Sequence, residues 1–464
     1  MNIVVAIIII LISTFLFKKA SGTLKVNLIN ISSFAFYSLM AFEFIGVTLV
    51  FLGYRDHYLI SKITDNNVIN KTYWSMAYVM IILPLTIFVS NYFIFKLKKI
   101  DKTYIKKIQQ DIIMENTKTQ KMIYIIVVMA LFICLIAIIY VFCCIGYVPL
   151  FKYFDSNFNF AEERINTVRN FNGNEYIKNI VMLMVTPILS YIAYIYMRTT
   201  KEKKWLILFI ISFILNIFVK TYDFSKAPLI YYICYFFIIE VTLGKTFKLK
   251  KIIPFVIVAI VLVVLSYTIV AGYRGSFISL SNGPISRVVI SQAGTLFLHF
   301  DAFPEKIDYL NGHSFPPIFK FIFGEGDYYV RSGRVVMQEY NKAGIENGTA
   351  GVMSTVFLGE AYANFGIFGI IISPILVGLI FSSILCIFLK SKKTPLNIVL
   401  YLQCFIIFTN VLLAGFIDFI YNIQFMVSLL VVFGIKIVTN EKNINFVKEN
   451  VLLKMIKRKN NEGE

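Results

Sequence analysis

Arginines, carboxylates and aromatics gather in the segment 271–369, which lies between two long apolar stretches. Its arginines are the residues best suited to chemistry, because a guanidinium presents a fixed fork of donors that fits phosphate oxygens and stays charged at any relevant pH. Arg331 and Arg334 are three residues apart, so on a helix they would share one face. A phosphate-bearing substrate is one interpretation of that pair. A solvated pair balanced by Asp327 and Glu339 is the other.

Charge in this segment is balanced, unlike that of most other links in the chain. The basic residues of 272–350 are Arg274, Arg287, Lys306, Lys320, Arg331, Arg334 and Lys342, and the acidic ones are Asp301, Glu305, Asp308, Glu325, Asp327, Glu339 and Glu346. The other charged links, with one exception at 152–175, are rich in lysine. That contrast makes the balanced segment the leading candidate for the working part of the protein.

Metal chemistry finds no support in the sequence. The chain has 3 histidines and 6 cysteines; the histidines form no HExxH pattern, and every cysteine lies within or at the edge of an apolar run. No GxGxxG or Walker loop is present either. We therefore expect neither a metal nor a nucleotide cofactor.

Composition indicates an integral membrane protein. A chain of 464 residues with 58% hydrophobic and only 15% charged residues cannot be a solvated globule. The net charge of +19 is no sign of nucleic-acid binding, because the lysines and arginines lie in links beside apolar runs. We predict an all-α polytopic fold in a single integral membrane domain, 1–464, with a large extracytoplasmic loop at 272–350.

Apolar runs long enough to cross about 30 Å of hydrocarbon recur along the chain. We predict eleven spans, at 3–17, 31–53, 73–95, 122–145, 176–197, 205–219, 227–241, 252–271, 357–389, 395–414 and 416–438. Lysine-rich links alternate with balanced ones, so the positive-inside rule predicts an outer N-terminus and a cytoplasmic C-terminus in a plasma membrane. The link 96–121 has the strongest positive bias.

Two further features carry polar groups into apolar surroundings. Glu43 lies in the middle of the second predicted span, where a carboxylate is costly and is a functional candidate by default, with a protonated structural glutamate as the alternative. The segment 285–300 has no proline and repeats polar residues in four-residue steps up to His299. This pattern predicts a helix that lies in the membrane interface or lines a cavity.

Several short motifs resemble the O-antigen and capsule repeat-unit polymerases (Wzy-type), a family of bacterial inner-membrane enzymes. The resemblance rests on GYVPLF at 146–151, AGYRG at 271–275, the long loop that follows, and above all STVFLGEAYANFGIFG at 354–369. It implies a membrane-embedded glycosyltransferase of the C type, inverting and metal-independent. Its donor and acceptor would be oligosaccharides on undecaprenyl pyrophosphate, and its partners a flippase and a chain-length regulator.

The resemblance also assigns roles to residues of this chain. Outer-loop basic groups that bind pyrophosphate correspond to Arg164, Arg169, Lys226, Arg274 and Arg287, although a lysine at 226 departs from the arginine often found there. From the main motif, Tyr362 and Asn364 are candidates for binding the glycan, together with Arg331 and Arg334.

Elementary chemistry agrees with such a reaction. A glycosyl pyrophosphate already has a good leaving group, so catalysis needs its charge stabilised, the acceptor hydroxyl positioned and a proton accepted. Glu360 is the first candidate base, because the loop there re-enters apolar surroundings that should raise its pKa. His299 is the second. A capping carboxylate and a hydrogen-bonded histidine are the respective alternatives.

Two other functions fit the same pattern. A lipid-linked oligosaccharide flippase or other transporter would place charged residues in mid-span around a central cavity, where Glu43 is nearly alone. A ligase that transfers a finished glycan to another acceptor would share the outer arginines. The sugar, its linkage and the polymer type are not readable from the sequence.

Overall fold

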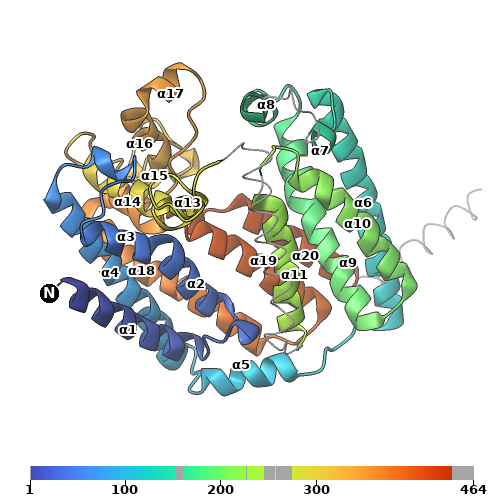
Figure 1. Ribbon diagram of the computed structural model, residues 1–464. Coiled ribbons are helices and arrows are strands. Elements are labelled where there is room, and N and C mark those ends of the chain that lie inside the picture. Colours follow the sequence, from blue (N-terminus) through green and yellow to red (C-terminus); the bar gives the residue numbers. More distant parts are fainter. Residues whose placement is uncertain (1, 153–159, 226, 245–256, 258–273, 441–464) are drawn as a thin grey trace, which may run out of the picture. The chain divides into compact units, whose positions relative to one another are not determined.

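The computed structural model describes residues 2–152, 160–225, 227–244, 257 and 274–440. Every regular element in those residues is a helix, which confirms the predicted all-α class (Figure 1). The helices long and apolar enough to cross a membrane number 7 among the described residues, as expected of a polytopic protein. These are Asn2–Leu28, Ile31–Phe51, Asn66–Ile94, Thr117–Ile145, Ile177–Thr200, Phe357–Lys390 and Ile417–Val438.

The α-helices are α1 (Asn2–Ser21), α2 (Ile31–Leu39), α3 (Ile45–Phe51), α4 (Asn66–Val89), α5 (Ile100–Gln109), α6 (Thr117–Ile145), α7 (Pro149–Lys152), α8 (Phe160–Val168), α9 (Thr186–Thr200), α10 (Lys203–Lys220), α11 (Ala227–Thr242), α13 (Pro284–Val289), α14 (Ser291–Ala302), α15 (Lys320–Phe323), α16 (Ser332–Tyr340), α17 (Lys342–Glu346), α18 (Phe357–Lys390), α19 (Pro395–Val411) and α20 (Ile423–Val438). The π-helical turns are η2 (Met40–Phe44), η4 (Ser90–Ile94) and η5 (Ile177–Val185). The 3₁₀ turns are η1 (Val26–Leu28), η3 (Ile60–Lys62), η7 (Pro317–Phe319) and η8 (Ile417–Phe419).

The other four predicted spans are not among these seven helices. At 227–241 and 395–414 the structure has α11 and α19, of 16 and 17 residues, which extend about 24–26 Å and so fall short of the hydrocarbon core. At 205–219 it has α10, which carries lysines at both ends. The predicted span 252–271 lies outside the described residues apart from residue 257. The count of eleven therefore stays a prediction.

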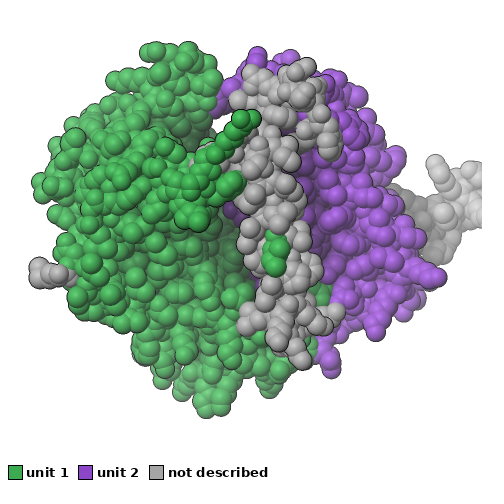
Figure 2. Space-filling model, viewed as in Figure 1, with its two compact units in different colours: residues 1–110, 240–391, 404–422 green, residues 111–239, 392–403, 423–464 purple. Residues whose placement is uncertain are grey.

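The chain divides into two compact units (Figure 2). Unit 1 comprises residues 1–110, 240–391 and 404–422, and unit 2 comprises 111–239, 392–403 and 423–464. Unit 2 has an apolar core in which Ile138 and Val141 of α6 pack with Met182 and Val219. The segment that carries the candidate site belongs to unit 1.

Unit 1 is organised around α18, which packs along α4, while α14 lies against both helices. Close approach of α18 to α4 depends on Gly378, because a Cβ there would lie 2.8 Å from the Cβ of Thr86. The spans begin with ordinary caps: Asn30 and Ser33 form a capping box before α2, and the Asp65 side chain accepts from Asn67 at the start of α4. These contacts fix α18 against the helices beside it.

The helix predicted at 285–300 breaks in two. α13 ends at Val289 and α14 begins at Ser291, and every residue from Ala293 to Ala302 is buried. Of the two placements expected for this helix, the membrane interface is therefore wrong for α14, and the lining of a cavity stays a prediction. The polar side chains of α14 contact other parts of unit 1: Thr295 donates to the carbonyl of Ser354, and His299 contacts Ser332.

The two ends of α18 have different surroundings. At its N-terminal end gather the helices of the large loop, α13 to α17, and at its C-terminal end lies α5 (Figure 1). The loop segment 274–356 contains five short α-helices, α13 to α17, joined by links that are not α-helical.

Candidate functional site

The motif at the start of α18 does not form one continuous helix. Gly366 has φ 58° and ψ −136°, a conformation open to glycine but not to residues with a side chain. The ring of Tyr309 packs against this residue, so a Cβ would lie 2.9 Å from its Cζ. The residues before Gly366 therefore form a separate short helix, and Glu360 lies on it.

Arg331 joins two carboxylates from distant parts of unit 1. Its Nε lies 2.9 Å from Oε1 of Glu360. Its Nη1 and Nη2 donate to Oδ1 and Oδ2 of Asp418 at 3.0 and 2.9 Å. The second pair is a bidentate guanidinium–carboxylate interaction, the geometry in which such bonds are strongest. Three elements meet here, namely the residue before α16, the start of α18 and the turn η8.

Burial differs within this acid cluster, defined as Arg331, Glu360 and Asp418. The side chain of Glu360 is 2% exposed, whereas those of Arg331 and Asp418 are 25% and 26% exposed. Burial would lower the pKa of Arg331, but the hydrogen bond and charge of Asp418 and the charge of Glu360 outweigh it and raise the pKa. The guanidinium is thus permanently charged, and Asp418 is the carboxylate that a substrate can reach.

Backbone groups complete the surroundings of Glu360. The amide of Ile417 donates to its Oε2 at 3.0 Å. Gly415 lies directly beneath the pair, since a Cβ there would lie 2.6 Å from Nη2 of Arg331 and would also collide with Oε2 of Glu360. The side chain of Gln292 on α14 anchors the same link by donating to the carbonyl of Leu413 at 2.9 Å.

His299, the second predicted base, is buried and contacts Ser332, the residue after Arg331. Its side chain is 0% exposed. Its Nδ1 lies 2.7 Å from the carbonyl of Thr295 and its Nε2 lies 3.2 Å from Oγ of Ser332. Since a carbonyl only accepts, Nδ1 carries the proton and Nε2 faces the hydroxyl. Burial lowers the pKa of His299 to about 4, so the ring is neutral and holds the first residue of α16, next to Arg331.

Asn364 is also enclosed. It is 0% exposed. Its amide nitrogen donates to the carbonyl of Glu360 at 2.9 Å and to Oγ of Ser314 at 3.1 Å. Its oxygen accepts from the amide of Gly312 at 3.1 Å. Ser314 in turn donates to the carbonyl of Val330 at 3.0 Å, the residue before Arg331. Asn364 therefore ties the loop to α18 and is not placed at an open surface.

Tyr362 is a buried packing residue with a polar end. Its ring stacks on Phe300 at 4.2 Å. Its hydroxyl donates to the carbonyl of Phe303 at 2.8 Å and accepts from Nζ of Lys71 at 2.6 Å. Lys71 is exposed on α4, so it is the part of this group that solvent reaches.

The predicted phosphate-binding arginines are in varied surroundings. Nη1 of Arg334 donates to the carbonyls of Ala350 and Gly351 at 3.1 and 3.0 Å, so this arginine fastens the loop that precedes α18. Arg331 already uses Nε, Nη1 and Nη2 on carboxylates. Neither is poised for a pyrophosphate in this arrangement.

The other predicted arginines are exposed. Arg274 and Arg287 belong to unit 1, and Arg164 and Arg169 to unit 2. Lys226 lies outside the described residues. These four guanidinium groups are solvent-exposed, whereas the side chain of Arg331 is only 25% exposed and lies between two carboxylates.

Sequence reasoning missed Asp418 and Lys71. A signal for Asp418 was present, because it lies in GFIDF at the start of an apolar run, much as Glu360 lies in FLGEAY at the start of another. A carboxylate at the same end of two predicted spans could have suggested the pairing. Lys71 had no such signal.

The acid cluster can accept a proton from a hydroxyl group. It holds two carboxylates and one guanidinium, and Asp418 presents its carboxylate at the surface with both oxygens oriented by Arg331. Comparisons of this chain with protein-family models, with curated proteins and with solved structures found no match.

Proposed function

We propose that this protein is a membrane glycosyltransferase that polymerises oligosaccharide repeat units carried on undecaprenyl pyrophosphate into a surface polysaccharide, such as O-antigen, capsule or exopolysaccharide. It acts on the outer face of a bacterial plasma membrane. The observation that carries the proposal is the acid cluster at the N-terminal end of α18, in which Glu360 comes from the motif that resembles repeat-unit polymerases and is joined by Arg331 and Asp418.

Membrane orientation supports an outer active site. The C-terminal end of α18 lies beside α5, whose exposed lysines belong to the most basic link of the chain. By the positive-inside rule that end is cytoplasmic. α18 breaks at Gly366, and the part from 367 to Lys390 has 24 residues, a length of about 36 Å, which still exceeds the hydrocarbon thickness. Its other end, with Glu360, is then on the outer face, where lipid-linked units arrive after flipping.

In the proposed reaction, Asp418 is the general base. A hydroxyl oxygen of the acceptor glycan attacks the anomeric carbon of the sugar attached to the donor pyrophosphate. The bond from that carbon to the pyrophosphate oxygen breaks, and its electron pair leaves with the undecaprenyl pyrophosphate. The hydroxyl proton passes to the Asp418 carboxylate and then to water. Exposed arginines such as Arg274 and Arg287 stabilise the charge that develops on the leaving group.

The roles of the remaining site residues follow from their contacts. Glu360 is buried and orients Arg331, and Arg331 orients both oxygens of Asp418. Glu360, the first candidate base from the sequence, is therefore a positioning residue in this proposal. Asp418 is the base instead. His299 supports the same arrangement through Ser332.

The test is a glycan profile of a deletion strain complemented with variants. We expect the deletion to abolish long polysaccharide while single repeat units still reach the outer surface. The wild-type gene and a Lys342→Gln variant should restore polymer, and Asp418→Asn should not. A normal-length polymer that is merely unattached would show a ligase instead.

A transporter is the second candidate, and Glu43 is the observation that favours it. Its side chain is 0% exposed, and neither carboxyl oxygen has a hydrogen-bond partner among the described residues. It lies in the π-helical turn η2, a form often found at functional sites. Repeat units that accumulate on the cytoplasmic face of the deletion strain would support transport and overturn the polymerase.

A further inference from the structure

The short basic helix α5 lies at one end of the unit 1 spans. Five residues, 95–99, separate its first residue, Ile100, from Ile94, where η4 ends. The last residues of that span are exposed apolar side chains, Phe93 to 68% and Ile94 to 59%. A link of five residues reaches at most about 18 Å when extended. α5 therefore lies near the lipid headgroups at the end of that span.

One face of α5 is fastened to the ends of other helices. The hydroxyl of Tyr104 donates to the carbonyl of Ile29 at 2.7 Å, just before α2. Lys107 donates to the carbonyl of Ser391, just after α18. Gly22, just after α1, approaches so closely that a Cβ would lie 2.7 Å from the amide nitrogen of Asp101. α5 therefore lies across the same end of several spans, as an interfacial helix does.

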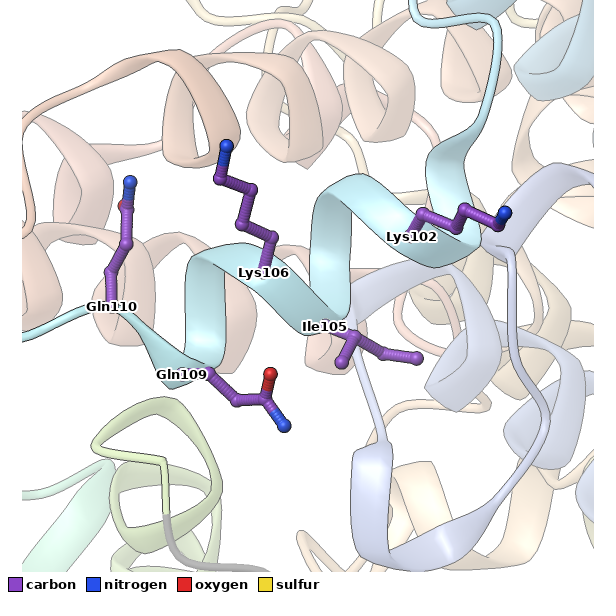
Figure 3. A pocket seen from close by; sticks show the side chains of 5 residues that line it. All are labelled: Lys102, Ile105, Lys106, Gln109 and Gln110. Carbon is purple, nitrogen blue, oxygen red and sulfur yellow. The ribbon is translucent and has the colours of Figure 1, made fainter.

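The opposite face of α5 is exposed and basic. The buried residues Ile100, Tyr104, Lys107 and Ile108 follow the period of a helix, and the positions between them point outward. An open pocket on this outward face is lined by Lys102, Ile105, Lys106, Gln109 and Gln110 (Figure 3). Figure 3 shows the Lys106 and Gln110 side chains pointing to the same side of the helix.

Charge on and just before α5 is nearly all positive. Lys102 and Lys106 on the helix and Lys96, Lys98 and Lys99 before it are exposed, and between residues 96 and 110 only Asp101, in the first turn, is acidic. Lys102 and Lys106 have no acidic partner within the described residues. Two ammonium groups at i and i+4 repel each other when no counter-ion is near, and an anion bound to both would remove this repulsion.

We infer that the outward face of α5 binds the headgroup of an anionic phospholipid, with the phosphate held by Lys102 and Lys106. The position of α5 across the ends of the spans, the exposed Ile105 in the same pocket and the exposed apolar end of the span that precedes α5 all point to a membrane lipid. A polybasic amphipathic helix beside a span is a usual form of such a site. This inference does not depend on the proposed glycosyl transfer.

The test is a titration of the full-length protein in neutral detergent with phosphatidylglycerol, followed by native mass spectrometry. Each lysine near an anionic surface favours binding by about fivefold. We therefore expect the double variant Lys102→Gln/Lys106→Gln to raise the Kd of the tightest phosphatidylglycerol site by about 25-fold. The double arginine variant should keep the site, because it retains the charge.

The matched control replaces two lysines of the same basic link that lie outside α5. Lys118 and Lys121 are exposed in the first turns of α6, so Lys118→Gln/Lys121→Gln removes the same charge. We expect this variant to bind phosphatidylglycerol as the wild type does. If both double variants lost phosphatidylglycerol binding equally, the loss would come from net charge alone, and the site on α5 would be overturned. An unchanged Kd in the α5 variant would overturn it too.

Other ligands are distinguished in the same experiment. Equal binding of phosphatidylcholine, or displacement of phosphatidylglycerol by inorganic phosphate at the same concentration, would overturn a lipid site. A short RNA that binds α5 in place of the lipid would do so too. Thermal melting of each variant in detergent should match that of the wild type, so that loss of binding is not loss of folding.

Discussion

The guanidinium of Arg331 donates two parallel hydrogen bonds, of 3.0 and 2.9 Å, to the carboxylate of Asp418, although the residues are 87 positions apart. Arg331 comes directly before α16, whereas Asp418 belongs to the turn η8 at the start of the last span, Ile417–Val438. Through Glu360 the same guanidinium also reaches α18. One side chain thus links the large loop to the ends of two spans.

Activity should depend strongly on Asp418. The Asp418→Asn change keeps the size of the side chain but removes its ability to accept a proton, and general-base catalysis is worth about 10²- to 10⁴-fold in rate. We expect polymer formation to fall by about that factor at normal protein abundance. Polymer length and amount on gels check this, with Asp308→Asn, an exposed acid of the same loop, as the control. Near-normal polymer would remove Asp418 from the reaction.

The free energy of unfolding should fall when Arg331 is removed, and part of the loss should be recovered when Glu360 is neutralised as well. Arg331→Met leaves the 2% exposed carboxylate of Glu360 without its cation, and breaking a buried pair from one side costs about 3–5 kcal/mol. Arg331→Met/Glu360→Gln also removes that uncompensated charge and should melt at a higher temperature than Arg331→Met alone. Thermal unfolding in detergent measures both. A double variant no more stable than the single one would contradict this pairing.

Gly415 should tolerate no side chain. A methyl group there would lie 2.6 Å from Nη2 of Arg331 and against Glu360, so Gly415→Ala should displace the acid cluster and strongly reduce polymer. Gly351 has open space around its Cα, and Gly351→Ala should behave as wild type. Polymer from both variants at equal abundance is the measurement. Equal activity would show that the cluster is not needed in this arrangement.

Acid should destabilise the protein through His299. Its pKa is about 4 in the folded protein, against an ordinary value of 6.5, because burial disfavours the charged ring. The unfolded chain therefore binds a proton first, and the free energy of unfolding falls as the pH drops from about 6.5 to about 4, by roughly 3 kcal/mol in total. Melting temperatures at pH 7 and pH 5 should differ less for His299→Gln than for the wild type. An equal difference would exclude His299 as the cause.

Orientation can be read from single cysteines on a background without the native ones. Lys342 in α17 and Lys106 in α5 are both exposed, and we place them on opposite sides of the membrane. An impermeant maleimide should label Lys342→Cys in intact cells and Lys106→Cys only after permeabilisation. The reverse pattern would invert the topology and with it the proposed outer site.

The sequence by itself determined the class of this protein, because hydropathy and length act locally along the chain. Span 31–53 corresponds to α2, η2 and α3, and 357–389 to α18, since about 20 apolar residues form a helix wherever lipid or a packed core surrounds them. The chemistry-bearing motif at 354–369 was likewise visible in the residues. Its carboxylate, Glu360, stands out because it lies where the chain re-enters apolar surroundings.

Only the tertiary structure decided what those residues do to one another. The partner of Glu360 is Arg331, 29 positions away, and the more exposed carboxylate is Asp418, whose place at the start of an apolar run does not say which cation it meets. His299 had the spacing of an interfacial stripe but became buried, because α14 packs between α18 and the helices α3 and α4. Periodicity records which face of a helix is polar, whereas the packing of distant helices decides whether that face meets lipid, water or an ion pair.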